Sequence, residues 1–570
     1  MSSSLEQEQL FDPPLDKPRH LRYWQRCART LLPHHYTPTD SQRLTLGFFI
    51  VAAIDLLSAS SSSPPPSNSN NDPKKTTKPL LTPSDRCALR TWVLSCQHPH
   101  GGFCGSPSHV FPHAAHDTNS ESGNANIAAT YFALLLLPML TEPGHADGGA
   151  YVGVDRAKTL RWLRRLQRVD GDGSFGEVIY EVPSFGGGGG GDGEKDTGKD
   201  KRGKYIVGGG KDMRYCYLAA TIRWILRGDV AEEGDEAYVE DIDVAALVRH
   251  IRRSQSYDGG FSESLGHESH AGYAYCAVAA LALLDRPVNN DVDDDDTPGD
   301  DEISQQQPTP SPHYTQRKML QEGIGNIPGF ISFLVSRQFA YLEAQEKKAE
   351  EEDDEDPDTE NFQMASLSLS EHTQDDDDHT KHVGFNGRCN KVADTCYTWW
   401  VLGSLSILGV LDQPTERSSS SSSPPATATT TTTTAVVDPQ SLAASRTFLL
   451  EKTQHAIGGF GKRARDPPDI YHSSLGLFAL ATMGDPSLKK VDAELAVSVD
   501  TVRKIEAGRR GLLRRARGNR GNGTASGADA ASAATGAGFG KALVDMAVSM
   551  GSGGGGGGGG ERPAWLDVVV

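Results

Sequence analysis

The sequence lacks several features that mark common protein classes. It carries eight cysteines in 570 residues, none spaced as CxxC, so neither a disulfide framework nor a paired-cysteine metal motif is indicated. No secretory signal pattern follows the opening "MSSSLEQEQL", and the longest clean apolar runs, such as "YFALLLLPML" at 131 to 140, are too short to span a bilayer. These absences favour a cytoplasmic protein without a transmembrane segment.

An excess of positive charge is also missing. The formal charge is −19, of which residues 343 to 378 contribute −14 and residues 291 to 302 contribute −8. The rest of the chain therefore carries about +3 on the formal counting. Bulk charge indicates neither nucleic acid nor an anionic membrane as a partner.

Low-complexity segments interrupt the chain and cannot contribute to a core. Serine, threonine and proline runs, glycine tracts and acidic blocks hold too few apolar side chains to offset the entropy lost on ordering. We expect an N-terminal tail at 1–18, one folded domain at 19–485 and a disordered low-complexity tail at 486–570. The insertions expected inside the domain lie at about 57–83, 186–210, 288–315, 343–380 and 415–437.

A repeat becomes visible once the insertions are set aside. Its first part is a helix that ends in Gln or nearby polar residues, followed by a glycine turn with an aromatic residue, as in "HIRRSQSYDGGFSE" at 250 to 263. Each turn leads into a second helix that is apolar around most of its circumference, whereas the first helix keeps charges on one face. Related first parts lie at 92–105, 162–177 and 448–462, and one more is split between 330–338 and 384–388.

Helix pairs in tandem predict an all-α fold. An opening pair at 19–57 joins the five units and gives about six helical hairpins. Outer and inner helices in this order are typical of a closed α/α barrel, or toroid. We therefore expect the second helix of every unit to face the barrel axis.

Polar side chains recur where the inner helices begin. They are Asn126, Asp212 with Arg214, His270, Asp394 with Cys396, and His472. The amino-terminal ends of parallel inner helices share one mouth of a barrel, and their dipoles favour anions there. The phase of the repeat therefore predicts one polar site at that mouth.

Asp394, Cys396 and His472 are the candidate metal ligands and catalytic residues. Carboxylate, thiolate and imidazole all bind zinc, and three protein ligands leave one position open for a substrate. Each residue also has an ordinary structural explanation: Cys396 as a small buried hydrophobe, Asp394 as a helix cap and His472 as a buried polar group with a partner. Spacing within the chain leaves both explanations open.

Further hydrogen-bond donors are expected at the same mouth. They are His270, Arg388, Lys391, Tyr397 and Lys462. Distributed donors with fixed positive charge suit a diphosphate leaving group, although an ordinary solvated ring of charges has the same composition. Inner-helix aromatic residues such as Tyr217 and Trp400 would either line an apolar funnel or fill a core. Zinc, diphosphate and funnel together describe the alkylation of a thiol by an isoprenoid diphosphate.

The motifs that carry a family resemblance are "GFNGRCNKVADTCYTWW", "DMRYCY", "ESHAGYAYC" and "GGFGKRARDPPDIYH". On these motifs the chain resembles the β subunits of protein prenyltransferases, and within them the type I protein geranylgeranyltransferases, over about 19–485. The resemblance implies a zinc-dependent enzyme that pairs with a separate α subunit. It would transfer a geranylgeranyl group from geranylgeranyl diphosphate to the cysteine of a C-terminal CaaX motif, with X often leucine. Proteins of the Rho, Rac or Rap type of small GTPase are the implied substrates.

The resemblance also implies roles for individual residues. The implied zinc ligands are Asp394, Cys396 and His472. The implied diphosphate-binding residues are His270, Arg388, Lys391, Tyr397 and Lys462. The implied contacts with the isoprenoid or the peptide come from Thr45, Asn126, Arg214, Tyr217, Cys276 and Trp400.

Two positions favour the geranylgeranyl branch over the farnesyl branch. Thr45 stands where farnesyltransferases look to carry a tryptophan that shortens the funnel, and Lys462 stands where they have an aspartate that helps to hold magnesium. A lysine there neutralises diphosphate charge directly, so Mg²⁺ is not expected to be required. Asn126 departs from a histidine that is common in the family, which leaves the choice of the terminal substrate residue open.

Other functions stay open at this point. A farnesyltransferase β subunit or a subunit serving Rab-type tails with two cysteines would share most of these motifs. A terpene cyclase of the same fold would need an acidic motif inside the barrel, whereas "DVDDDD" lies in an expected insertion. A non-catalytic helical scaffold would hold no stoichiometric zinc.

Overall fold

We analysed the fold in a computed structural model of the full chain. The residues that the structure describes are 13–58, 79–107, 124–141, 149–168, 171–181, 205–228, 233, 237–286, 313–341, 381–411, 437 and 439–518.

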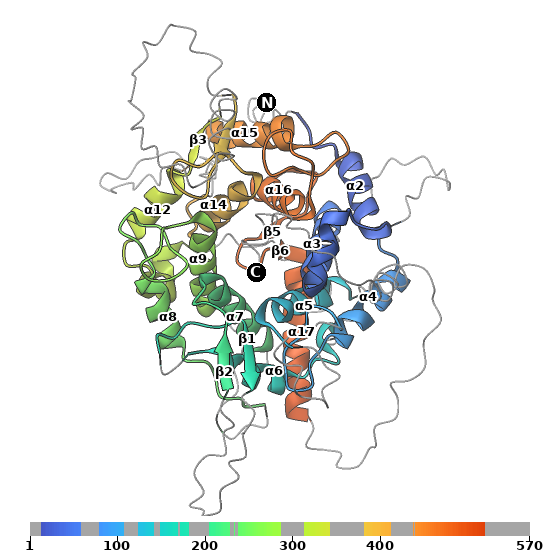
Figure 1. The fold of residues 1–570 in the computed structure, drawn as a ribbon, viewed down its shortest axis with the longest axis vertical. Helices are drawn as coiled ribbons and strands as arrows, with labels where there is room; N and C mark the ends of the chain where they lie inside the picture. Colours follow the sequence, from blue (N-terminus) through green and yellow to red (C-terminus); the bar gives the residue numbers. More distant parts are fainter. Residues whose placement is uncertain are drawn as a thin grey trace, which may run out of the picture.

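Six inner helices form a closed ring, which confirms the predicted toroid (Figure 1). Each contacts the next one along the chain, and α16 contacts α3 to close the circle. The inner helices are α3 (Arg43–Leu57), α5 (Ile127–Met139), α7 (Met213–Leu226), α9 (Ala271–Asp285), α14 (Thr395–Ile407) and α16 (Ile470–Thr482). They are buried on nearly every side, as expected for helices that pack against two ring neighbours and an outer helix.

Outer helices surround this ring and keep polar faces. For example, α8 (Val244–Arg253) buries Leu247, Val248 and Ile251 and ends in two arginines. The other outer helices are α2 (Lys17–Arg29), α4 (Pro83–Ser95), α6 (Arg156–Leu166), α12 (Ile327–Val335) and α15 (Pro439–Phe448), with the shorter α11 (Lys318–Gly323). Short helical turns connect some pairs: η1 (His34–Gln42), η3 (Gly149–Tyr151), η4 (Tyr314–Gln316) and η5 (Leu449–Thr453).

The glycine turns between outer and inner helices have one recurring geometry. In four units an isolated antiparallel bridge joins the Gln to the Phe of the motif: Gln97 with Phe103, Gln167 with Phe175, Gln255 with Phe261, and Gln454 with Phe460. Gly259 has φ +90°, and a Cβ there would lie 2.3 Å from the backbone of Gly329. Because only glycine accepts both conditions, the turn can pack directly against α12, the outer helix of the next unit.

The fold also contains short β-hairpins. β1 (Val178–Glu181) pairs with β2 (Tyr205–Gly208), and β3 (Gln338–Ala340) pairs with β4 (Val383–Phe385), both antiparallel. The second expected insertion therefore ends earlier than its predicted boundary at 210, because 205–208 form a strand. Nearly all of the other four expected insertions, including the two acidic blocks, lies outside the described residues.

The C-terminal segment differs from the expected tail. Residues 486–518 continue the fold through β5 (Val491–Asp492), β6 (Val497–Ser498) and helix α17 (Val499–Gly518), with β5 and β6 drawn over the centre of the ring in Figure 1. The Tyr217 hydroxyl donates to the Glu494 carbonyl at 3.0 Å, and the Tyr275 hydroxyl donates to the Ala493 carbonyl at 2.7 Å. The folded domain extends past 485, and residues 519–570 of the expected tail lie outside the described residues.

Ion pairs and a cation–π contact hold this segment to the ends of the inner helices. Arg286, which follows α9, pairs with Asp492 at 2.9 Å and with Glu494 at 3.1 Å. The guanidinium of Arg509, fully buried on α17, lies 3.7 Å from the centroid of the Trp224 ring at the end of α7. Because these contacts join the carboxyl ends of inner helices, the segment covers the end of the barrel opposite the helix starts.

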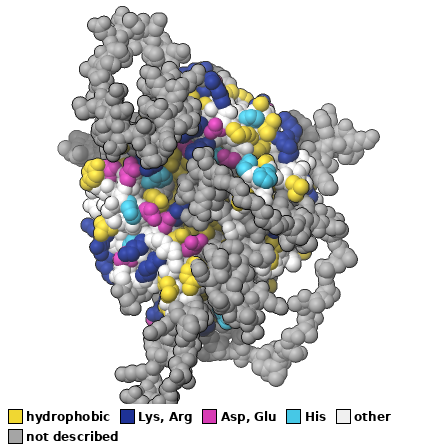
Figure 2. Space-filling model, viewed as in Figure 1, with side chains coloured by type: hydrophobic (Ala, Val, Ile, Leu, Met, Phe, Trp, Pro, Cys, Tyr) yellow, Lys and Arg dark blue, Asp and Glu magenta, His cyan; other side chains and the backbone are white. Residues whose placement is uncertain are grey.

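The described surface carries charges of both signs. In the part of Figure 2 that grey atoms leave visible, basic, acidic and histidine side chains are interspersed and form no large patch of one sign. Among the described residues, no helix combines the length and apolarity needed to cross a bilayer.

Candidate metal centre

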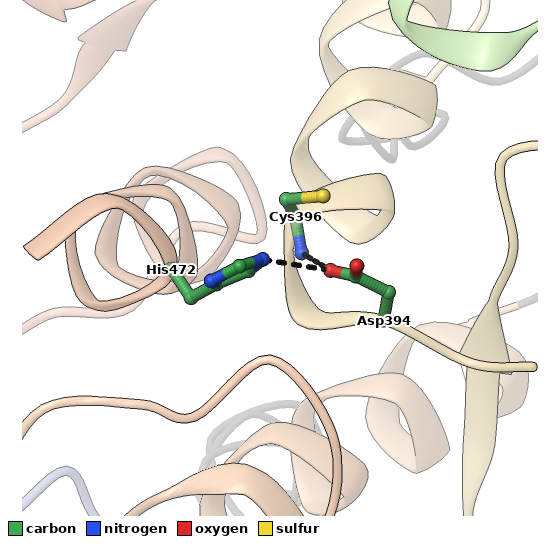
Figure 3. Close-up of side chains that lie close together, drawn as sticks. All are labelled: Asp394, Cys396 and His472. Carbon is green, nitrogen blue, oxygen red and sulfur yellow. Dashed lines mark hydrogen bonds and ion pairs between the residues drawn. The ribbon is translucent and has the colours of Figure 1, made fainter. Parts of the chain in front are cut away.

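Asp394, Cys396 and His472 come together at the starts of α14 and α16 (Figure 3). One candidate ligand atom from each residue lies within 4.8 Å of the other two, and all three residues are buried. Asp394 Oδ1 is 3.3 Å from His472 Nε2 and accepts the Cys396 backbone N–H at 2.8 Å. Asp394 is therefore a helix cap, as one explanation held, and also the neighbour of a thiol and an imidazole.

Asp469 fixes the orientation of His472. This residue caps α16: its Oδ1 accepts the His472 backbone N–H at 2.8 Å, while its Oδ2 lies 2.6 Å from His472 Nδ1. A carboxylate at Nδ1 keeps a proton on that nitrogen, so Nε2, which lies 3.3 Å from Asp394 Oδ1, is the nitrogen available to a metal ion once it loses its own proton. This carboxylate-histidine arrangement is typical of metal-binding histidines.

The charges of the cluster suit a cation. Burial opposes ionisation of Asp394, but His472, together with Cys396 and Lys462, outweighs it and holds the pKa of Asp394 below its ordinary value. Burial also opposes the charged form of His472, yet Asp469 and Asp394 raise its pKa well above the usual range. Burial, and next the Asp394 carboxylate, raise the pKa of the Cys396 thiol to about 12.

A zinc ion fits this donor set. Zinc bonds of about 2.0–2.3 Å to nitrogen, oxygen and sulfur can be made by groups gathered as closely as these, with a small inward movement. A divalent cation would reverse the environment that keeps the Cys396 thiol protonated, because a coordinating thiol loses its proton. Among the described residues, this is the one group of three or more such side chains that could hold a metal ion.

His270 and Tyr397 lie side by side at the same mouth. His270 caps α9, its Nδ1 accepts the Gly272 N–H at 3.0 Å, and its Nε2 lies 3.0 Å from the Tyr397 hydroxyl. Burial, followed by the nearby Arg388 and Arg214, lowers the pKa of His270 to about 4. The neutral ring thus carries its proton on Nε2, so His270 and Tyr397 offer uncharged N–H and O–H donors.

The predicted cations occupy loops around the metal cluster. Arg388 pairs with Glu268 at 3.0 Å, and Lys391 is exposed in the loop that leads into α14. The Lys462 carbonyl accepts the Thr395 N–H at 2.9 Å, and its ammonium group acts on the Asp394 carboxylate. These three cations therefore come from the segments that frame the start of α14.

Arg214 and Asn126 begin two other inner helices. Asp212 caps α7 and holds the Arg214 guanidinium through both carboxylate oxygens. Asn126 caps α5, where its Oδ1 accepts the Ala129 N–H at 2.8 Å. Both therefore lie at the predicted phase: Asn126 is itself a helix cap, and Arg214 is held by the residue that caps α7.

The predicted pocket residues lie on the inner helices below the mouth. Tyr217, Cys276 and Thr45 are buried on α7, α9 and α3, and the half-buried Trp400 lies 4.9 Å from the Tyr275 ring, centroid to centroid. The Tyr217 hydroxyl is 3.1 Å from that of Tyr131. The aromatic side chains of neighbouring inner helices thus contact one another below the mouth.

Two acidic residues of the mouth were missing from the sequence-based candidates. Asp469, which orients His472, could have been found from "PPDIYH", because an Asp after two prolines at the start of an apolar helix is a capping signal. Glu268, the partner of Arg388, lies 120 positions away in the chain. No local pattern signals that pairing.

A helical toroid with candidate metal ligands and cationic side chains at the starts of its inner helices defines a known class of protein. Residues 15–497 match the family model described as the prenyltransferase alpha-alpha toroid domain. Because this match covers most of the chain, the protein belongs to the prenyltransferase family, and the resemblance seen in the sequence is confirmed.

The particular relatives are β subunits. The geranylgeranyl transferase type-1 subunit beta of Arabidopsis thaliana is 24% identical over 85% of this chain and 88% of its own length. The corresponding subunit of Dictyostelium discoideum is 21% identical over 82% of this chain and 91% of its own. The protein farnesyltransferase subunit beta of Pyricularia oryzae is 23% identical over 82% of this chain and 63% of its own.

A solved structure supports the same fold. Candida albicans protein geranylgeranyltransferase-I complexed with GGPP superposes with a TM-score of 0.54 and 22% identity, covering 87% of this chain and 99% of that one. The toroid is therefore shared with a prenyltransferase. At this identity the likeness concerns the fold alone.

Proposed function

We propose that the protein is the catalytic β subunit of a heterodimeric protein geranylgeranyltransferase type I. It would transfer a geranylgeranyl group from geranylgeranyl diphosphate to the cysteine thiol of a C-terminal CaaX motif, in complex with a prenyltransferase α subunit. The observation that carries the proposal is the gathering of Asp394, Cys396 and His472 within 4.8 Å at the mouth that Arg388 and Lys462 also frame.

A zinc ion held by Asp394, Cys396 and His472 would supply a Lewis acid with an open position at which the substrate thiol is deprotonated near neutral pH. The chain's own residues do the rest. Asp469 orients His472, and the inner-helix aromatic side chains exclude water from the hydrocarbon. The substrate sulfur forms a bond to C1 of the isoprenoid while the bond from C1 to the diphosphate oxygen breaks.

The leaving diphosphate takes the electron pair of that bond, and its negative charge grows in the transition state. His270 and Tyr397 would donate neutral hydrogen bonds to it, while Arg388, Lys391 and Lys462 would supply positive charge. Such donors accelerate the reaction only if they bind the transition state more tightly than the substrate. Since Lys462 stands beside the cluster, added Mg²⁺ is not required.

Transfer assays with the purified heterodimer test this function. The chain, coexpressed with a prenyltransferase α subunit, is incubated with a peptide ending in CaaL and with either geranylgeranyl or farnesyl diphosphate, with and without Mg²⁺. We expect faster transfer of the twenty-carbon group and no stimulation by Mg²⁺. Absence of transfer from both donors would contradict the proposal.

A farnesyltransferase is the second candidate, because the Pyricularia oryzae relative is a farnesyltransferase β subunit at nearly the same identity. The small side chain at Thr45 favours the longer isoprenoid, since no indole fills the space beside the inner helices. Faster transfer of the fifteen-carbon group, stimulated by Mg²⁺, would favour the farnesyl assignment.

A further inference from the structure

An ion pair crosses the mouth between two neighbouring inner-helix starts. Arg388 Nη1 lies 3.0 Å from Glu268 Oε2, with the Arg388 side chain 43% exposed and that of Glu268 60% exposed. Arg388 belongs to the loop before α14 and Glu268 to the loop before α9. A cation assigned to the diphosphate therefore holds a carboxylate of the same chain.

The backbone around this pair is fixed. The Ala271 N–H donates to the Gly387 carbonyl at 2.9 Å, which ties the two loops together one residue before Arg388. Gly387 passes so close to Tyr397 that a Cβ would lie 2.3 Å from its ring. His270 lies beside the pair, and Arg388 is the neighbouring charge that most lowers the pKa of His270. Arg388 can therefore change its partner by side-chain movement alone, while the two loops stay in place.

We propose that Glu268 occupies the place of the diphosphate at Arg388. It pairs with Arg388 while the site is empty, is displaced by the incoming diphosphate, and pairs with Arg388 again when diphosphate leaves. This inference rests on the proposed function, since it assigns the exchange to the same diphosphate. It makes Glu268 a positioning residue that acts through Arg388.

Charge and exposure favour such an exchange. A solvent-exposed pair of one carboxylate and one guanidinium is weak and prefers its closed form by about two to five to one. A diphosphate carries more charge, and His270, Tyr397 and Lys462 add donors that Glu268 does not engage in the described structure. The pair is therefore firm enough to orient Arg388 and weak enough to be displaced.

Binding of inorganic pyrophosphate tests the inference without the transfer reaction. The Glu268→Gln heterodimer is titrated with inorganic pyrophosphate by calorimetry, beside the unmodified heterodimer. Because the competing carboxylate is gone, we expect pyrophosphate to bind about three- to sixfold more tightly, in line with the closed-to-open ratio of an exposed pair. Glu240→Gln, which removes the carboxylate from the exposed pair of Arg164 and Glu240 on the outer surface, should leave binding unchanged.

A double-mutant cycle shows whether Glu268 acts through Arg388. In an Arg388→Ala background, Glu268→Gln should change pyrophosphate binding by less than twofold. Unchanged or weaker binding in Glu268→Gln alone, or an equal gain without Arg388, would overturn the inference. If the unmodified heterodimer binds neither pyrophosphate nor geranylgeranyl diphosphate, the proposed function fails instead, so the two failures are distinguishable.

Discussion

Replacement of Asp469 by asparagine should weaken metal binding while keeping the fold. The amide oxygen of the substituted side chain can still accept the backbone N–H of His472, as Asp469 Oδ1 does at 2.8 Å. The amide nitrogen would then face His472 Nδ1, where Asp469 Oδ2 lies at 2.6 Å. An amide donates at that position, so Nδ1 would have to accept, and the neutral imidazole would carry its proton on Nε2, the nitrogen that would bind the metal.

The size of the effect follows from this change of tautomer. Loss of an outer partner of a metal-bound histidine weakens metal affinity about 10- to 100-fold, or about 1.4–2.7 kcal/mol. Competition with a zinc chelator, followed by zinc analysis of the heterodimer, measures the affinity directly. Asp155→Asn is a matched control, because Asp155 caps the outer helix α6 through its Oδ1 and Lys158 N. Zinc affinity of Asp469→Asn equal to that of the unmodified protein would refute the assigned role of Asp469.

The remaining predictions concern the pocket, the magnesium requirement and the C-terminal segment. Thr45→Trp should shift the ratio of transfer rates from the twenty-carbon to the fifteen-carbon donor by at least tenfold, because an indole would occupy space on the buried face of α3; an unchanged ratio would remove Thr45 from the pocket. Lys462→Asp should slow transfer without Mg²⁺ about 100-fold, the effect of losing one charged donor, and added Mg²⁺ should restore the transfer rate. A transfer rate of this variant that does not change with Mg²⁺ would contradict the prediction. Asp55→Asn should lower the unfolding free energy by about 2 kcal/mol at pH 7, because half-buried Lys489 loses one of its two carboxylate partners and keeps only Asp500. Burial opposes ionisation of Asp55, but Lys489 and Ser498 outweigh it and hold the pKa of Asp55 below its ordinary value. The stabilisation by the Asp55 carboxylate is therefore present above about pH 4. The difference in unfolding free energy between the two proteins, measured with urea, should shrink as the pH falls below that value.

The sequence predicted the toroid because the fold repeats. Five glycine turns and five apolar helices recur in one order, and each turn has a local cause in glycine, as at Gly259 with φ +90°. Because all inner helices begin at one mouth of the barrel, residues far apart in the chain could be predicted to lie together there. Asp394 and His472 were found in this way, although they are separated by 78 positions.

The C-terminal segment escaped prediction because its packing depends on distant partners. The sequence of α17 is rich in arginine, which indicates a solvated helix, yet Arg509 is fully buried against the Trp224 ring. Asp55 likewise holds Ser498 and Thr501 from more than 440 positions away. Neither contact leaves a periodic pattern in either segment, so composition alone placed the end of the domain too early.

Zinc content tests the central claim most directly. The account predicts one zinc per heterodimer for the unmodified protein, none for Cys396→Ala, and one for the control Cys216→Ala, which alters a buried cysteine on α7. Absence of zinc from the unmodified heterodimer, or one full equivalent retained after Cys396→Ala, would contradict it.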